Sequence, residues 1–269
     1  MVGSTPAPPC CGRPRPAIDR ASCFARCRPP SGDKLTALWS LFGLLAASAT
    51  GLPAPARAQL SGSINLETDY RLRGYSLSKG RPTGTAHLAY DHPSGIYLGA
   101  AAIGVAGRDE ASLLGVQGNV GYARRLSPTV SVDAGIHRSE YKTGYYGEWA
   151  RYTEGYVGLT VRQVTARIFY SPHYFQEGVA TVYGEVDAAM QPAPNWRLIA
   201  HIGALSYVRL PPYYYGNRDT QLDWRFAASR QIGRFEVHAA LSGGGPGKEY
   251  YAGKERDRTV LTAGASVNF

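Results

Sequence analysis

Apolar and polar residues alternate from residue 64 to residue 73. The even positions carry isoleucine, leucine, threonine and tyrosine, and the odd positions are all polar and mostly charged: Asn65, Glu67, Asp69, Arg71 and Arg73. A period of two predicts a β-strand with one apolar face. That face would pack on a core in a soluble protein, whereas in a membrane barrel it would meet lipid and the polar face would line the lumen. One strand does not distinguish these alternatives.

The same pattern recurs between turn residues and predicts twelve strands. Most of them approach the length of about ten residues that a tilted membrane strand needs. An even number of strands puts both chain ends on the periplasmic side of a barrel. The predicted strands cover roughly residues 63–74, 84–91, 96–104, 112–124, 130–140, 152–162, 164–171, 181–190, 196–207, 221–230, 235–242 and 259–269.

The connections between these strands alternate in length. Those after even strands are tight, at 92–95, 125–129, 163, 191–195 and 231–234. Those after odd strands are mostly longer, at 75–83, 105–111, 141–151, 172–180, 208–220 and 243–258. Short periplasmic turns and long extracellular loops are typical of outer-membrane barrels, whereas a soluble sandwich has no reason to sort its loops in this way. We therefore predict an all-β fold, an antiparallel up-and-down transmembrane barrel of about twelve strands in the bacterial outer membrane.

Aromatic residues support this orientation. We expect six of them on the apolar face near the ends of strands that abut a tight turn or the C-terminus, where they would form a girdle at the membrane interface. They are Tyr90, Tyr122, Trp196, Phe226, Phe235 and Phe269. A terminal strand that ends in Phe269 also resembles the signal read by the barrel-assembly machinery, which makes that machinery an expected partner.

The N-terminal region has the three parts of a secretory signal peptide. Lys34 precedes an apolar segment at 35–47, and Ala56-Arg57-Ala58 forms an A-x-A cleavage site. A transmembrane anchor is the alternative, but the apolar segment is short and prolines follow it. We predict a leader at 1–58, cleavage after Ala58, and a barrel domain at 59–269.

Removing the leader changes what the composition implies. All four cysteines lie in the leader, so the barrel domain has no disulfide, cysteine nucleophile or thiolate metal site. The net charge of +9 falls to +4, with 22 Lys and Arg against 18 Asp and Glu. The basicity therefore belongs mainly to the leader and gives no reason to expect a nucleic-acid partner.

Residues 69–76, Asp-Tyr-Arg-Leu-Arg-Gly-Tyr-Ser, resemble the D-Y-x-x-R-G-x-S opening of the TorF-family porins, also known as the Gcw_chp family. Residues 94–99 and 132–136 are similar to the S-G-x-Y-x-G and D-x-G segments of that family. The chain departs from the family at 114–117, where an acidic E-x-D strand is expected, and at 137–141, where a Tyr-Pro pair is expected. The resemblance covers about residues 61–269 and implies a barrel with a pore.

Charged residues of both signs fall on the predicted inward face. Opposed acidic and basic rows could order water and select small polar solutes, or they could pair across the lumen and plug it. Arg71 and Arg73 could attract anions near the extracellular end, with Gly74 allowing a bend, or they could simply pair with acidic neighbours. The pore-lining candidates are Glu67, Asp69, Arg71, Arg73, Asp133, His137, Glu154, Arg162, Arg167, Glu185, Asp187, Arg197, His201, Asp223, Arg225, Glu236 and His238.

The predicted outer loops contain aromatic clusters. These could bind sugars or lipopolysaccharide phosphate, or they could fold over the mouth of the barrel and pack on one another. The loop candidates are Tyr145, Tyr146, Trp149, Tyr213, Tyr214, Tyr215, Tyr250 and Tyr251. Outer-membrane lipid and lipopolysaccharide are therefore expected partners.

Catalysis has weak support in the sequence. His137, Ser139 and Glu140 are the nearest set resembling a hydrolase triad, and no G-x-S-x-G nucleophile elbow occurs. The histidines lack metal-ligand spacing, so neither a metal nor a cofactor is predicted. We expect no enzyme but a channel for passive diffusion of small hydrophilic solutes or ions. A plugged barrel acting as a structural or ligand-binding surface protein is the alternative, and an outer-membrane lipid hydrolase is third.

Overall fold

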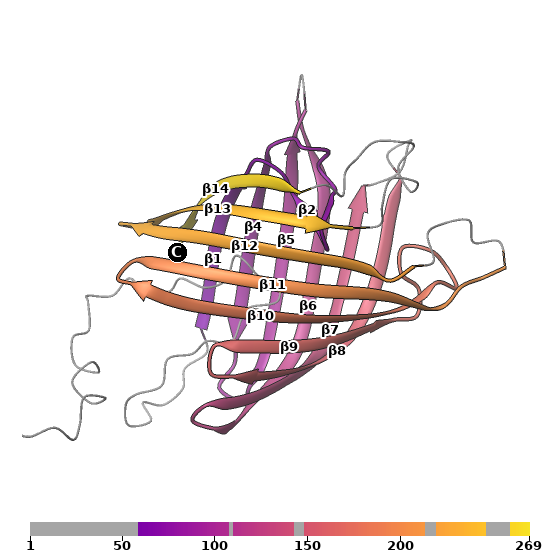
Figure 1. Ribbon diagram of the computed structural model, residues 1–269, viewed down its shortest axis with the longest axis horizontal. Coiled ribbons are helices and arrows are strands. Elements are labelled where there is room, and N and C mark those ends of the chain that lie inside the picture. The colour runs from indigo at the N-terminus through magenta and orange to yellow at the C-terminus, as the bar shows by residue number, and fades with distance from the viewer. Residues whose placement is uncertain (1–58, 108–109, 143–147, 213–218, 246–258) are drawn as a thin grey trace, which may run out of the picture. The chain divides into compact units, whose positions relative to one another are not determined.

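The computed structural model describes residues 59–107, 110–142, 148–212, 219–245 and 259–269. Over these ranges the chain forms strands and no helix, and hence none that is long and apolar enough to cross a membrane. Twelve strands form a closed antiparallel barrel in which β1 pairs with β14 on one side and β4 on the other (Figure 1). The barrel strands are β1 (Gln59–Glu67), β4 (Thr83–Asp91), β5 (Ile96–Ala106), β6 (Ala111–Ser127), β7 (Val130–Lys142), β8 (Trp149–Val161), β9 (Val164–Ser171), β10 (Ala180–Ala193), β11 (Trp196–Arg209), β12 (Gln221–Ile232), β13 (Phe235–Gly244) and β14 (Val260–Asn268).

The predicted fold and the alternation of loop lengths are confirmed. Four of the tight connections consist of two residues, at 128–129, 162–163, 194–195 and 233–234. Arg162, Asn195 and Gly233 have positive φ angles of 56°, 63° and 61°, as expected where a two-residue turn must match the twist of its strands. Arg162 therefore lies in an exposed turn, and its prediction as a pore-lining residue is wrong because β8 ends one residue earlier.

The barrel wall has an apolar outer face and a polar inner face. Outward-facing leucine, isoleucine and valine side chains such as Leu66, Ile136 and Ile202 are exposed, whereas inward-facing neighbours such as Asn65 and His137 are buried. This arrangement reverses that of a soluble protein and matches lipid as the outer solvent.

The predicted aromatic positions all point outward, but two of them are not at the end of their own strand. Tyr122 lies five residues before the last residue of β6, although it pairs with Ile96, the first residue of β5. Trp196 and Phe235 are the first residues of β11 and β13, and both are exposed, as is Phe269. Phe226 is also exposed, yet it lies in the middle of β12 between Ala200 and Leu241. Its assignment to the girdle is wrong because β12 continues to Ile232, beyond its predicted end.

The strand predicted at 63–74 is wrong beyond Glu67. After β1 the chain leaves the wall and forms a separate hairpin of β2 (Arg71–Leu72) and β3 (Tyr75–Ser76). Alternation continues through 73 because hairpin arms have the same period of two as barrel strands. The side chains of Tyr70 and Leu72, expected to meet lipid, pack instead against a buried apolar cluster.

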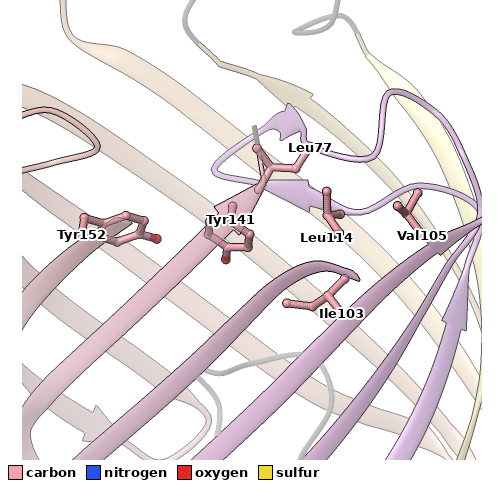
Figure 2. Packing of buried hydrophobic residues seen from close by; sticks show 6 residues of the cluster. All are labelled: Leu77, Ile103, Val105, Leu114, Tyr141 and Tyr152. Atoms are coloured by element: carbon pink, nitrogen blue, oxygen red, sulfur yellow. The ribbon is translucent and has the colours of Figure 1, made fainter. Parts of the chain in front are cut away.

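We name residues 68–82 the inner hairpin, because the segment packs against the inner face of the wall. Its buried partners come from β5, β6, β7 and β8, and Figure 2 shows Leu77 beside Tyr141 and Leu114. The cluster consists of Leu77, Ile103, Val105, Leu114, Tyr141 and Tyr152. An apolar core within the barrel is unexpected for a fully polar lumen. It holds the apolar side chains of the inner hairpin against β5 to β8.

Asp69 organises the base of the inner hairpin. Its Oδ1 accepts hydrogen bonds from the Oγ atoms of Ser76 and Ser78 at 2.5 and 2.7 Å and from the Gly80 amide at 3.1 Å. Three donors to one buried carboxylate replace the water that the charge loses on burial. Asp69 is therefore a structural element of the hairpin and not a residue of the barrel wall.

We expect Gly74→Ala to release the inner hairpin from the wall. Gly74 has φ 78°, and a Cβ there would lie 2.7 Å from the backbone of Gly244. Gly80 has a similar φ of 72°, but a Cβ at that position would have no other atom within 4 Å. Gly80→Ala therefore carries only the cost of holding an alanine at a positive φ, about 1–2 kcal/mol. Limited trypsinolysis should cleave after Arg71 and Arg73 much faster in Gly74→Ala than in Gly80→Ala. Equal rates would show that close contact with β13 does not hold the hairpin.

Candidate functional site

A polar cavity of about 170 Å³ lies between the inner hairpin and the barrel wall. Acidic, basic and hydroxyl-bearing side chains line it together with apolar residues such as Leu72, Ile199 and Trp224. Nine of the predicted pore-lining residues meet here, namely Glu67, Asp69, Arg71, Arg73, Glu185, Asp187, His201, Asp223 and Arg225. The cavity is therefore the part of the lumen in which the sequence-predicted charges converge.

Arg73 anchors the inner hairpin at the edge of this cavity. Its Nη2 donates to both carboxylate oxygens of Glu154 on β8, at 2.7 and 2.9 Å, and the two side chains are 7% and 1% exposed. The guanidinium also lies 3.9 Å from the centre of the Tyr183 ring and 5.2 Å from that of Tyr174. A cation enclosed by a carboxylate and aromatic faces is held in place, so Arg73 acts first as a structural anchor.

Arg71 lies on β2, just before the turn that contains Arg73, and has a different environment. Its Nη1 lies 3.2 Å from Asp69 Oδ2, and its Nη2 donates to the carbonyl of Gly74. Arg71 is therefore engaged within its own hairpin. This agrees with the alternative prediction that the arginine pairs with an acidic neighbour.

A histidine links three strands on the opposite side of the cavity. His201 on β11 places Nδ1 2.8 Å from Asp187 Oδ1 on β10 and Nε2 2.9 Å from Asp223 Oδ1 on β12. The Tyr183 hydroxyl donates to Asp223, at 3.3 and 3.2 Å from its two oxygens. Glu185 lies beside this chain of contacts, two residues from Asp187 on the same face of β10.

A second charged contact connects β1 with β12 and β13. Glu67 Oε1 lies 3.6 Å from Arg225 Nη2 and 3.6 Å from His238 Nε2. These distances are longer than those of a tight hydrogen-bonded ion pair.

The other predicted residues lie outside the cavity. Asp133 and Arg167 form a buried ion pair at 3.2 Å between β7 and β9. His137 is buried and contacts Ser139 at 2.7 Å. Arg197, Glu236 and His238 face inward near the beginnings of β11 and β13.

The proposed hydrolase set does not come together. Glu140 lies on the outer face and forms an ion pair with Arg138 at 2.6 Å, whereas His137 and Ser139 are buried on the inner face. Neighbouring residues of a strand point to opposite faces, so Glu140 cannot orient His137.

Sequence reasoning missed the aromatic residues that complete the site. Tyr183 shares the inward parity of Glu185 and Asp187 on β10, which is a signal that could have identified it. Tyr174 and Phe175 come from the connection after β9 and pack against the same apolar cluster. Burial raises the pKa of the Tyr174 phenol, so its hydroxyl stays protonated and can donate a hydrogen bond.

Most predicted loop candidates lie outside the described residues. These are Tyr145, Tyr146, Tyr213, Tyr214, Tyr215, Tyr250 and Tyr251. Trp149 is the first residue of β8 and is 46% exposed. The predicted leader at 1–58 is likewise outside these ranges and stays a prediction.

A closed antiparallel barrel with an apolar outer face and a polar, charge-lined interior defines a porin-like β-barrel. The chain belongs to the Gcw_chp family, described as bacterial protein of unknown function, whose model matches residues 53–267. The TorF name that the sequence resemblance also suggested stays a prediction. No curated protein sequence matches the chain.

The chain is similar to solved outer-membrane porins and channels at low sequence identity. The NanC porin is 10% identical with a TM-score of 0.50, over 78% of this chain and 99% of that chain. The KdgM porin is 9% identical with a TM-score of 0.49 over the same shares. The outer-membrane channel DcaP of Acinetobacter baumannii is 11% identical with a TM-score of 0.41, over 82% of this chain and 100% of that chain. At such identities the likeness to the NanC porin shows the fold alone.

Proposed function

We propose that the mature chain is an outer-membrane channel for passive diffusion of small hydrophilic solutes or ions. The observation that carries this proposal is the polar cavity beside the inner hairpin, lined by charges of both signs inside a barrel with an apolar outer face. A lumen wall of this kind can replace part of the hydration of a solute and orient its charges during passage.

The inner hairpin gives the proposed channel its size limit. Its apolar side chains pack against β5 to β8, its turn at Gly74 lies against Gly244 of β13, and the cavity beside it is lined by β1, β4, β6 and β10 to β14. Twelve strands lie between about eight, whose interior side chains fill, and the 16 to 18 of wide porins. A segment folded inward narrows such a lumen further, so the proposed solutes are small.

The remaining parts of the proposal follow from the sequence. The leader at 1–58 would direct export, Phe269 would engage the barrel-assembly machinery, and the outer loops would meet lipopolysaccharide. Catalysis has no role in this proposal, because passage through the lumen requires no covalent step.

A plugged barrel is the second candidate, favoured by the apolar cluster inside the wall. Leu77, Tyr141 and Tyr152 are buried there as in a soluble core, and such packing excludes water from that part of the lumen. In this case the cavity would be a closed pocket, and the outer surface would carry the function.

Planar-bilayer recording of the full chain, expressed in a Gram-negative host and purified folded, distinguishes the two candidates. We expect reproducible conductance steps, and we expect Arg225→Ala to move the reversal potential toward cation selectivity because it removes a positive charge from the cavity. Arg162→Ala is the control, since Arg162 lies in an exposed turn. A folded barrel that inserts and never conducts would contradict the channel and support the plugged barrel.

A further inference from the structure

Three potential metal ligands converge on one side of the cavity. Donor atoms of Glu185, Asp187 and His201 all lie within 4.8 Å of one another. Their proximity follows from the sheet, because Asp187 is the register partner of His201 and Glu185 is the next inward residue on β10. All three side chains line the polar cavity.

His201 is oriented as metal-binding histidines are. Its Nε2 contacts Asp223 at 2.9 Å, and the Tyr183 hydroxyl holds the same carboxylate. Metal-ligating imidazoles commonly donate their second ring N–H to a carboxylate, which fixes the ring and strengthens the ligand. With Nε2–H donated to Asp223, Nδ1 turns toward Asp187 at 2.8 Å, on the side where Glu185 lies.

The burial of Glu185 is a second, independent observation that favours a cation at this place. The residue is only 4% exposed, and its Oε1 has no hydrogen-bond partner within the described part of the chain. A buried carboxylate oxygen without a partner is costly unless a cation or donor satisfies it.

We propose that Glu185, Asp187 and His201 bind a divalent first-row transition metal ion, with Asp223 as the group that orients His201. One imidazole nitrogen and two carboxylates suit Zn²⁺ and similar ions. Ligands about 2.1 Å from one ion lie at most about 4.2 Å apart, so small side-chain rotations close the set. On binding, the ion would displace the proton between Nδ1 and Asp187, and this proton would be released to bulk water. The proposal does not depend on conductance.

Zn²⁺ titration of the folded full-length protein tests this site, with Cys10, Cys11, Cys23 and Cys27 changed to serine because cysteine thiolates also bind Zn²⁺. The protein is purified in detergent, treated with a chelator, dialysed, and titrated with Zn²⁺ by calorimetry. We expect one saturable Zn²⁺ per chain, lost in His201→Gln and in Glu185→Gln. Asp223→Asn should weaken binding about 10- to 100-fold, the usual effect of removing an orienting carboxylate.

Two matched variants control for nonspecific binding. His238→Gln and Glu236→Gln remove an inward histidine and an inward glutamate that lie outside the three-ligand set, and both should bind Zn²⁺ as the wild type does. A second measurement uses the wild type alone and so does not depend on the folding of any variant. In ¹⁵N-histidine-labelled protein, Zn²⁺ should shift the NMR signals of one imidazole. Absence of saturable binding, or a site retained in both His201→Gln and Glu185→Gln, would overturn the proposal.

Discussion

Replacing residues 69–81 with a short Gly-Ser linker should raise single-channel conductance severalfold. The inner hairpin occupies one side of the lumen and forms an apolar cluster with β5 to β8, so its removal converts packed protein into water-filled space. The linker can close the gap because Glu67 and Thr83 are register partners in neighbouring strands. The barrel wall itself should therefore remain closed.

The matched control places the same linker at residues 107–110, the four-residue connection between β5 and β6. That connection joins two neighbouring wall strands, and its described residues, Gly107 and Glu110, do not belong to the apolar cluster. Conductance should therefore stay at the wild-type level. Both proteins are recorded in the same bilayer and salt. An unchanged conductance in the hairpin replacement would show that another segment limits passage.

The family motif at 69–76 acquires a physical explanation from the hairpin. Asp69 accepts hydrogen bonds from Ser76 and Ser78, and Arg73 forms an ion pair with Glu154. Arg73 and Gly74 have φ angles of 47° and 78°, as a two-residue turn of the I′ type requires. The resemblance that identified the family thus marks the residues that build and dock an inward-folded segment.

Much of the wall could be predicted from the sequence because its rule is local. The inward positions of Glu185, Asp187 and His201 follow from a period of two. Their register does not follow from the tight turn at 194–195 alone, because the pairing shifts by one residue between Met190 and Ala193, and this shift places Asp187 opposite His201. The inward faces could therefore be predicted from the sequence, but the convergence of these side chains was not apparent from spacing alone.

The inner hairpin could not be predicted because its stabilising contacts are distant in sequence. Arg73 and Glu154 lie 81 residues apart, and Tyr70 contacts the Tyr141 hydroxyl 71 residues away at 3.2 Å. Local alternation is the same for a barrel strand and a hairpin arm. The one local cue was Gly74, whose positive φ permits the turn that takes the chain away from the wall.

Arg73→Ala should lower the free energy of unfolding by about 3–5 kcal/mol, the range for removing one partner of a buried ion pair. Glu154 would keep its charge in a place where its side chain is 1% exposed, and the contacts with Tyr183 and Tyr174 would be lost. Combining Arg73→Met with Glu154→Gln should recover part of this loss, because neither buried charge then remains.

The exposed pair of Arg138 and Glu140 supplies the comparison for this prediction. Its N–O distance is 2.6 Å, as short as that of the buried pair, but its side chains are 51% and 31% exposed. Solvent screening limits such pairs to about 0–1 kcal/mol, so Arg138→Ala should have a small effect. Urea unfolding in detergent, followed by tryptophan fluorescence, measures both variants. If Arg73→Ala were no more destabilising than Arg138→Ala, the inner hairpin would not be anchored through Glu154, and its position in the lumen would depend on the apolar cluster alone.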